Sequence, residues 1–245
     1  MPVSPLTSDS NKWAKRGALA GIVALVLGGG IASILLQGDD GSSGAAPAIQ
    51  ASKRVQKVVN SMSLAEKADA VVISGFDGTD GATKLAGSGQ IGGLLVGPED
   101  WFGVAKGKAL NARIHAAGST GSRIPPLIVG RQEGGVYRSY PDLPPALGQR
   151  EVAASGDPAQ VASWAKETGT ALGNAGFDLN LAPIADVATL DSPLSDRAFG
   201  DDPELVTAMT AASVRGCGRT DVACATPFFP GLGASSQSTS NLAKP

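Results

Sequence analysis

Beyond residue 48 the chain alternates short apolar runs with longer segments whose apolar residues recur at helical spacing. This alternation is typical of βα units around a parallel sheet, so it predicts an α/β fold. The predicted strands are the five apolar runs Ala70–Ser74, Ile91–Val96, Pro126–Val129, Phe177–Leu181 and Val222–Thr226. The predicted helices are Ser52–Met62, Val104–Ala117, Pro158–Ala175 and Pro203–Val214. Ser63 and Glu66 have the spacing of a capping box, which predicts a helix start after Ser63.

The segment Gly17–Leu36 is apolar and carries no charged residue. Twenty helical residues span the roughly 30 Å of bilayer hydrocarbon, so we expect a transmembrane signal-anchor at 17–36. Three basic residues precede it and two aspartates follow it, which places residues 1–16 in the cytoplasm and the rest outside the cell. A cleaved signal peptide, and hence a secreted protein, is the alternative; a buried core helix fits less well because the run is apolar on every face.

Residues 37–48 are small, polar and rich in Gly and Ser, which predicts a flexible linker before a folded domain at 49–245. The composition is globular, with 42% hydrophobic and 17% charged residues and a formal net charge of -2, which argues against nucleic acid as a partner. The chain has one histidine, His115, and two cysteines, too few for a His cage or a four-Cys zinc site. No metal and no cofactor are expected.

Cys217 and Cys224 lie outside the cytosol on this topology, where a disulfide forms and persists; two free thiols are the alternative.

Four stretches of the folded part resemble one enzyme family and keep its order. They are Met62–Lys67, Arg131–Pro145, Asn180–Val206 and Phe229–Gly233. The third is the most specific, since NLAPIADV and SDRAFGDDPELV closely match the motifs of glycoside hydrolase family 3, in particular those of the bacterial β-N-acetylhexosaminidases. The resemblance implies an N-terminal (β/α)8-barrel domain and an N-acetylglucosamine-type substrate. A full barrel needs eight strands, so with about five parallel strands this domain is expected to be a partial barrel.

The same resemblance predicts that catalysis is lost. Where the family carries Lys, His and a second His, this sequence has Pro227, Phe228 and Leu232. The Asp and His of the family's acid/base dyad fall on Ser238 and Ser240, which cannot protonate a leaving group near neutral pH. The nucleophilic Asp of the family lies on a later strand, beyond Pro245. We therefore expect no catalytic residue in this chain.

Four residues at family positions are the candidates for substrate binding: Arg131, Glu133, Asp186 and Arg197. Arg131 stands where the family has a sugar-contacting Asp, and a guanidinium, which only donates hydrogen bonds, cannot reproduce that contact. Arg197 matches an Arg that holds the substrate; the alternative is a structural ion pair with Asp196, Asp201 or Asp202. Glu133 and Asp186 either touch a ligand or brace their loops.

Trp101, which follows the second predicted strand, could stack on a sugar ring, although burial is its usual fate.

Three interpretations of function remain open. The first is a degenerate, membrane-anchored hydrolase that binds cell-wall glycan or a protein partner. The second is an active hydrolase acting on N-acetylglucosaminides, and the third is a relic without a stable fold. An open sheet exposes its edges, so a second copy or a partner protein is expected to cover them.

Overall fold

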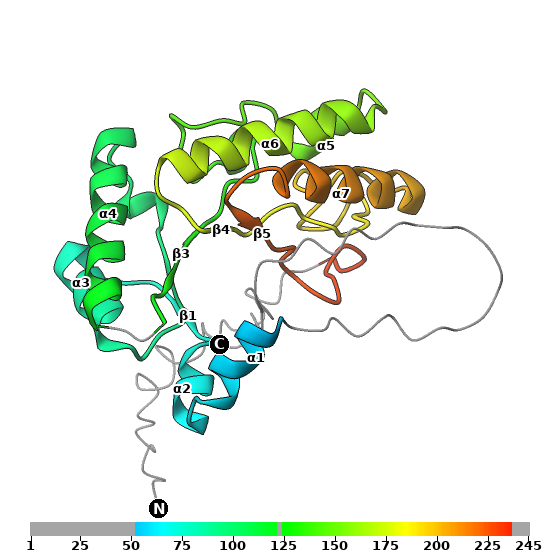
Figure 1. Cartoon of the computed structure of the whole chain (residues 1–245). Helices are drawn as coiled ribbons and strands as arrows, with labels where there is room; N and C mark the ends of the chain where they lie inside the picture. The colour runs from blue at the N-terminus through cyan, green and yellow to red at the C-terminus, as the bar shows by residue number, and fades with distance from the viewer. Residues whose placement is uncertain (1–51, 122–123, 237–245) are drawn as a thin grey trace, which may run out of the picture.

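The computed structural model describes residues 52–121 and 124–236 (Figure 1). One parallel sheet runs through it in the order β1-β2-β3-β4-β5. The strands are β1 (Ile73–Ser74), β2 (Gly93–Leu95), β3 (Leu127–Gly130), β4 (Leu179–Asn180) and β5 (Ala223–Cys224). The helices are α1 (Lys53–Asn60), α2 (Leu64–Asp69), α3 (Gly78–Ser88), α4 (Val104–Gly121), α5 (Gln149–Ala153), α6 (Pro158–Asn174) and α7 (Pro203–Cys217), with short 3₁₀ turns η3 (Pro98–Asp100) and η4 (Gly135–Tyr137). The α/β class and the five parallel strands are confirmed.

The start of the first strand was predicted too early. Ala70 is the C-cap residue of α2 in a right-handed helical conformation, because its N–H still bonds to the carbonyl of Glu66. The strand therefore begins at Ile73. The capping box is confirmed: the Ser63 hydroxyl accepts from the Glu66 N–H and the Glu66 carboxylate accepts from the Ser63 N–H. Helices α3 and α5 were not predicted.

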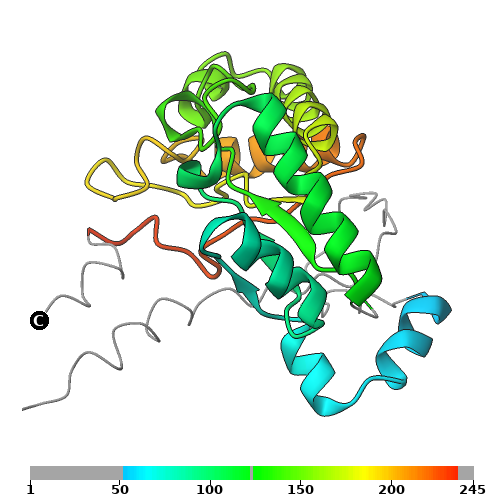
Figure 2. The same cartoon turned by 90° about the vertical axis from the view of Figure 1, so that its left-hand side faces the viewer.

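The long helices lie on one face of the sheet. Figures 1 and 2 show α3 and α4 side by side along the β1–β3 half, and α6 beside α7 over β4 and β5. The opposite face carries an apolar cluster in which Val129, Leu179 and Leu181 are buried. Alternate residues of each strand thus serve two separate layers of apolar packing.

The packing on the helix side centres on aromatic rings. Tyr140 is fully buried, with its ring centroid 4.7 Å from those of Trp101 and Phe177, and its hydroxyl donates to the Val96 carbonyl at 2.8 Å. The Trp101 indole N–H donates to Asp142 at 2.5 Å. Trp101 is only 7% exposed, so it belongs to this core rather than to a sugar-stacking platform.

Helices α6 and α7 approach each other closely at Gly216. A Cβ atom there would lie 2.1 Å from the carbonyl oxygen of Ala162, so only glycine permits this packing. Just beyond, the sulfur atoms of Cys217 and Cys224 are bonded across a Cα–Cα distance of 6.4 Å. The disulfide ties the end of α7 to β5.

None of the helices in the described parts of the chain is both long and apolar enough to cross a membrane. The predicted anchor at 17–36 and the predicted linker at 37–48 lie outside the described residues.

Candidate functional site

The loops that leave the carboxyl ends of β3, β4 and β5 form the candidate site, hereafter the mouth: residues 131–148, 181–202 and 225–236. The loop after β3 is fixed to β4 at its start, because the Gln132 N–H donates to the Asn180 side-chain oxygen at 2.9 Å and the Asn180 amide donates back to the Gln132 carbonyl at 3.2 Å. The Gln132 amide group also donates to the carbonyls of Tyr140, Leu143 and Pro144. A buried side chain thus sets the path of the loop on both sides of Glu133.

Glu133 and Arg197 form a bidentate ion pair in the mouth. The Arg197 Nε and Nη2 groups donate to the two Glu133 carboxylate oxygens at 2.7 and 2.5 Å. Glu133 is almost fully buried, whereas the Arg197 side chain is 18% exposed. The predicted alternative partners of Arg197 were therefore wrong: the charge is matched by a carboxylate 64 positions earlier, and Asp202 instead caps α7 through the Glu204 N–H.

Aromatic rings flank the guanidinium of Arg197. Its central carbon lies 5.5 Å from the Tyr137 ring centroid and 5.2 Å from that of Phe228, distances at which a cation is attracted to the ring face. Burial lowers the pKa of Arg197, but the hydrogen bonds and charge of Glu133, with smaller contributions from Tyr137 and Asp186, outweigh burial and raise it. The group is a permanent, oriented cation whose Nη1 makes no hydrogen bond to a described residue.

Asp186 braces the loop after β5. Its Oδ1 atom accepts from the backbone N–H groups of Leu232 and Gly233, at 2.5 and 2.9 Å. A Cβ atom at Gly233 would lie 2.1 Å from the Val187 carbonyl oxygen, so glycine is needed for this close approach. Asp186 was expected either to touch a ligand or to brace its loop, and these hydrogen bonds brace the loop.

Arg131 stands at the end of β3 and is exposed. Within the described parts of the chain its side chain makes no hydrogen bond or ion pair. The mouth therefore combines the Glu133–Arg197 ion pair, the rings of Tyr137 and Phe228, and a loop held by Asp186, and these residues form the framework of the mouth. The sequence did not single out Tyr137. Arg131 remains outside that framework.

The residues of this framework come from the stretches that carry the family motifs. Comparison with known proteins supports the same family. The family described as "Glycosyl hydrolase family 3 N terminal domain" matches residues 56–244, which is most of the chain. The chain belongs to glycosyl hydrolase family 3.

Two curated relatives of this family 3 chain are β-hexosaminidases by name. The Beta-hexosaminidase of Stenotrophomonas maltophilia (strain K279a) is 36% identical over 132 residues, 51% of this chain and 38% of that protein. Beta-hexosaminidase LpqI of Mycobacterium tuberculosis (strain ATCC 25618 / H37Rv) is 29% identical over 178 residues, 71% of this chain and 44% of that protein. The chain thus spans less than half the length of either relative.

Solved family 3 structures share the fold. A β-N-acetylglucosaminidase from Paenibacillus sp. str. FPU-7 has a TM-score of 0.69 at 26% identity, over 73% of this chain and 35% of that one. A β-N-acetylhexosaminidase from Beutenbergia cavernae DSM 12333 has a TM-score of 0.63 at 27% identity, over 73% of this chain and 57% of that one. The five-stranded sheet is therefore similar to a part of the family 3 barrel.

At the positions where the family carries its catalytic groups, this domain has other residues. Phe228, where the family has His, packs against Arg197, and Leu232 packs in the cluster beneath the same loop. Ser238 and Ser240 lie outside the described residues. His115 is on α4, with its Nε2 3.1 Å from the Gly176 carbonyl and 3.6 Å from the Asp178 carboxylate. Asp178 precedes β4, so the single histidine of the chain is at the end of the sheet opposite the mouth.

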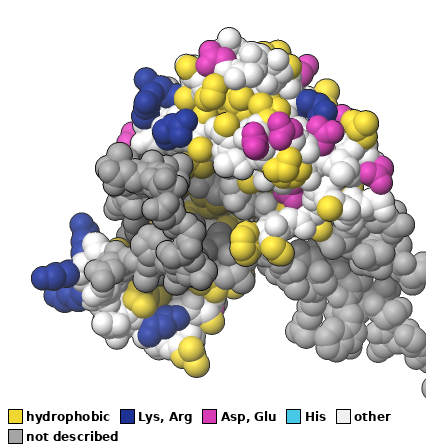
Figure 3. Space-filling view, turned by 90° about the vertical axis from the view of Figure 1, so that its right-hand side faces the viewer, with side chains coloured by type: hydrophobic (Ala, Val, Ile, Leu, Met, Phe, Trp, Pro, Cys, Tyr) yellow, Lys and Arg dark blue, Asp and Glu magenta, His cyan; other side chains and the backbone are white. Residues whose placement is uncertain are grey.

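The mouth is also rimmed by exposed apolar side chains. Val136, Leu190 and Phe229, one from each loop, are 90%, 79% and 94% exposed. Figure 3 views the side on which the loops after β4 and β5 lie, and it shows groups of hydrophobic side chains among acidic and basic ones. In the described parts of the chain no cluster of His, Cys, Asp and Glu could hold a metal ion.

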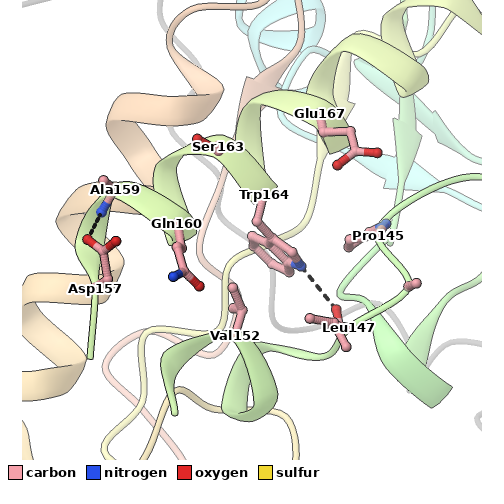
Figure 4. A pocket seen from close by; sticks show the side chains of 10 residues that line it. Pro145, Leu147, Val152, Asp157, Ala159, Gln160, Ser163, Trp164 and Glu167 are labelled. Carbon is pink, nitrogen blue, oxygen red and sulfur yellow. Dashed lines mark hydrogen bonds between the residues drawn. The ribbon is translucent and has the colours of Figure 1, made fainter. Parts of the chain in front are cut away.

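A separate pocket of about 530 Å³ lies between α5, α6 and the segment 145–147 (Figure 4). The Trp164 indole N–H donates to the Leu147 carbonyl across it at 3.0 Å, and Asp157 caps α6 through the Ala159 N–H at one end. Because Trp164 is only 9% exposed, little of its ring is free to stack on a ligand. None of the four predicted binding residues lines this pocket.

Proposed function

We propose that the mouth of this family 3 domain binds a glycan that contains N-acetylglucosamine, and that the described domain does not hydrolyse it. The geometry of Arg197 carries the proposal. The Glu133 carboxylate and the two flanking rings orient this arginine before any ligand arrives, and its Nη1 group can donate to an acetamido oxygen or a carboxylate. Relatives named β-hexosaminidase and β-N-acetylglucosaminidase support this ligand class.

The proposed loss of hydrolysis rests on the side chains of the mouth. Glycoside hydrolysis needs a proton donor and a carboxylate on opposite sides of the sugar's anomeric carbon. Pro227, Phe228 and Leu232 offer no titratable group, and Glu133 is held in its ion pair. The mouth keeps an oriented cation among aromatic rings, and these groups are suited to binding a glycan.

A thermal melt of the full chain in mild detergent, followed by circular dichroism, tests both parts. At about one hundred times its dissociation constant, a neutral tetramer of N-acetylglucosamine should stabilise the fold by about 2.7 kcal/mol, which raises the midpoint by roughly 5–10 °C. Arg197→Lys, which keeps the charge but not the fork, should lose most of this shift. Arg215→Lys on the outer helix α7 is the matched control and should keep it.

Other outcomes decide among the remaining functions. A cooperative melt that ignores the sugar would contradict glycan binding and favour a protein partner, and no cooperative melt would favour a relic. Steady release of a chromogenic leaving group from an N-acetylglucosaminide, abolished by Arg197→Lys, would establish an active hydrolase instead.

We also propose that residues 17–36 anchor the domain to the outer face of the cell membrane. The support is the uncharged apolar run with basic residues before it and aspartates after it. The full chain should pellet with membranes, and a variant with Val23, Leu25 and Leu27 replaced by Lys should not, because each charge at bilayer depth costs about 3 kcal/mol. A wild-type chain recovered only from the medium would mean that the segment is a cleaved signal peptide.

A further inference from the structure

Helix α1 carries a basic face made of Lys53, Arg54 and Lys57. Successive helical residues turn by about 100°, so these three side chains lie on one side of the helix and its valines on the other. The basic side chains are exposed, whereas the valines are half-buried. Within the described residues, none of the three basic side chains makes an ion pair. The helix therefore presents unpaired cations to its surroundings.

The stability of α1 does not explain these cations. Lys53 and Arg54 stand in the first turn, which holds no acidic residue. The helix dipole is positive at that end and disfavours cations there. The helix also has no buried residue, so its packing does not require them. A partner outside the domain is therefore the better explanation for the basic face.

The charge of this end of the chain differs in sign from the charge of the rest. Residues 53–69, which hold α1 and α2, have four basic and two acidic residues, whereas residues 70–245 have 13 and 17. Figures 1 and 2 show both helices at the lower end of the described domain, away from α6 and α7. Figure 3 keeps the same vertical direction and shows basic side chains on this lower part. An anionic surface would attract this end and repel the remainder.

The position of α1 in the chain places it near such a surface. Only residues 37–52 separate it from the proposed anchor, and a Gly/Ser-rich chain of that length spans roughly 22 Å on average. Three cations bind a membrane weakly by themselves, but a tether of this reach gives them a high effective concentration. Each basic residue near an anionic bilayer then strengthens the contact by about fivefold.

A contact through α1 would also set the direction of the mouth. Helix α2 ends at Asp69 and β1 begins at Ile73, so this pair of helices enters the sheet at the amino end of its first strand. The five strands are parallel, and the mouth lies at their carboxyl ends. A bilayer against α1 therefore leaves the mouth facing away from it.

We infer that the basic face of α1 docks on the anionic headgroups of the membrane that holds the anchor, and that this contact turns the mouth outward. The inference rests on the anchor proposed for residues 17–36 and does not depend on which ligand the mouth binds. Lys53, Arg54 and Lys57 contact the lipid phosphates. The domain is then held in one orientation rather than free to turn on its tether.

A fluorescent label on Asn60→Cys tests the inference in the full chain inserted into lipid vesicles. The two native cysteines are joined in a disulfide, so the introduced thiol takes the label. Asn60 is exposed and lies one turn beyond Lys57. The vesicles carry a quencher on their headgroups, and they are made of phosphatidylcholine alone or of phosphatidylcholine mixed with phosphatidylglycerol.

The fluorescence lifetime separates quenched from unquenched labels. Their ratio should be more than about tenfold higher in the anionic vesicles than in the neutral ones. Lys57→Gln should lower the ratio in the anionic vesicles about fivefold. Glutamine at Lys53, Arg54 and Lys57 together should lower it to the value in neutral vesicles.

A matched control replaces Lys106, Lys108 and Arg113 of α4 with glutamine. These side chains are exposed and carry the same total charge, so the control separates a local contact from the net charge of the protein. The ratio should stay within about twofold, because charges beyond the screening length contribute little. Circular dichroism checks that each variant is folded.

Flotation of the vesicles separates the two proposals. If the chain floats with both kinds of vesicle and the ratio is the same in both, the docking of α1 is wrong and the anchor stands. An excess of quenching that survives the triple substitution in α1 would also overturn the docking. A chain that floats with neither kind contradicts the anchor, and the inference fails with it.

Discussion

Replacing Tyr140 with alanine is expected to lower the free energy of unfolding by about 4 kcal/mol, the largest effect of any single side chain discussed in this protein. The ring is fully buried against Trp101 and Phe177, so its loss leaves a cavity as well as an unpaired Val96 carbonyl. Urea unfolding monitored by circular dichroism measures the change. Phe102→Ala, at a 71% exposed neighbour of Trp101, is the control and should change stability by less than about 0.5 kcal/mol.

Tyr140→Phe isolates the hydroxyl and should cost about 1–2 kcal/mol. It also has a pH signature. Burial raises the pKa of Tyr140 well above its ordinary value, so its stabilising contribution is complete below about pH 10, where the unfolded tyrosine titrates, and is lost as the pH rises toward the folded pKa. The variant should lose less stability than the wild type above pH 10. A loss with alkaline pH equal in both proteins would contradict this assignment.

Replacing Arg197 with methionine is expected to lower the free energy of unfolding by about 3 kcal/mol. Removing one partner of a buried pair costs about 3–5 kcal/mol, and the partial exposure of Arg197 places this pair at the low end. The cost arises because Glu133 stays buried without a counter-charge. Urea unfolding of the single and double variants measures it.

The double variant Glu133→Leu with Arg197→Met should cost clearly less than the sum of the two single changes, because no unpaired charge remains. Arg113→Met is the control: its guanidinium lies 3.9 Å from Asp80 with both side chains largely exposed, so no measurable change is expected. Strict additivity of the two mouth substitutions would show that the ion pair contributes nothing to the fold.

The strands of the sheet could be predicted from the sequence because each lies in an apolar run that is shorter than a typical helix. Helix α3 could not be: Gly78, Gly81 and Gly87 lower its intrinsic propensity, and only Ala82 and Ala86 are buried. Its packing against α4 holds it in place, which is tertiary information. Helix α5 has five residues, too few to show a period.

The positions of the site were predictable, but their partners were not. The motifs place Arg131, Glu133, Asp186 and Arg197 on the loops that follow the strands, where the structure has them. Proximity along the chain favours the nearby aspartates as partners of Arg197, whereas the fold brings Glu133 to it from 64 positions earlier. Glu133 could have been identified from the motif that contains it. A glutamate on a buried loop needs a cation as partner, and Arg197 is a family arginine that this chain keeps.

The agreement between chain order and strand order bears on how the domain assembles during synthesis. Each strand pairs with the strand made just before it, so a chain growing from its N-terminus meets every sheet partner already in place. The two cysteines are seven positions apart, so oxidation needs only α7 and β5 to be in place. We therefore expect assembly by addition to a single growing edge, and the disulfide marks that β5 has joined it.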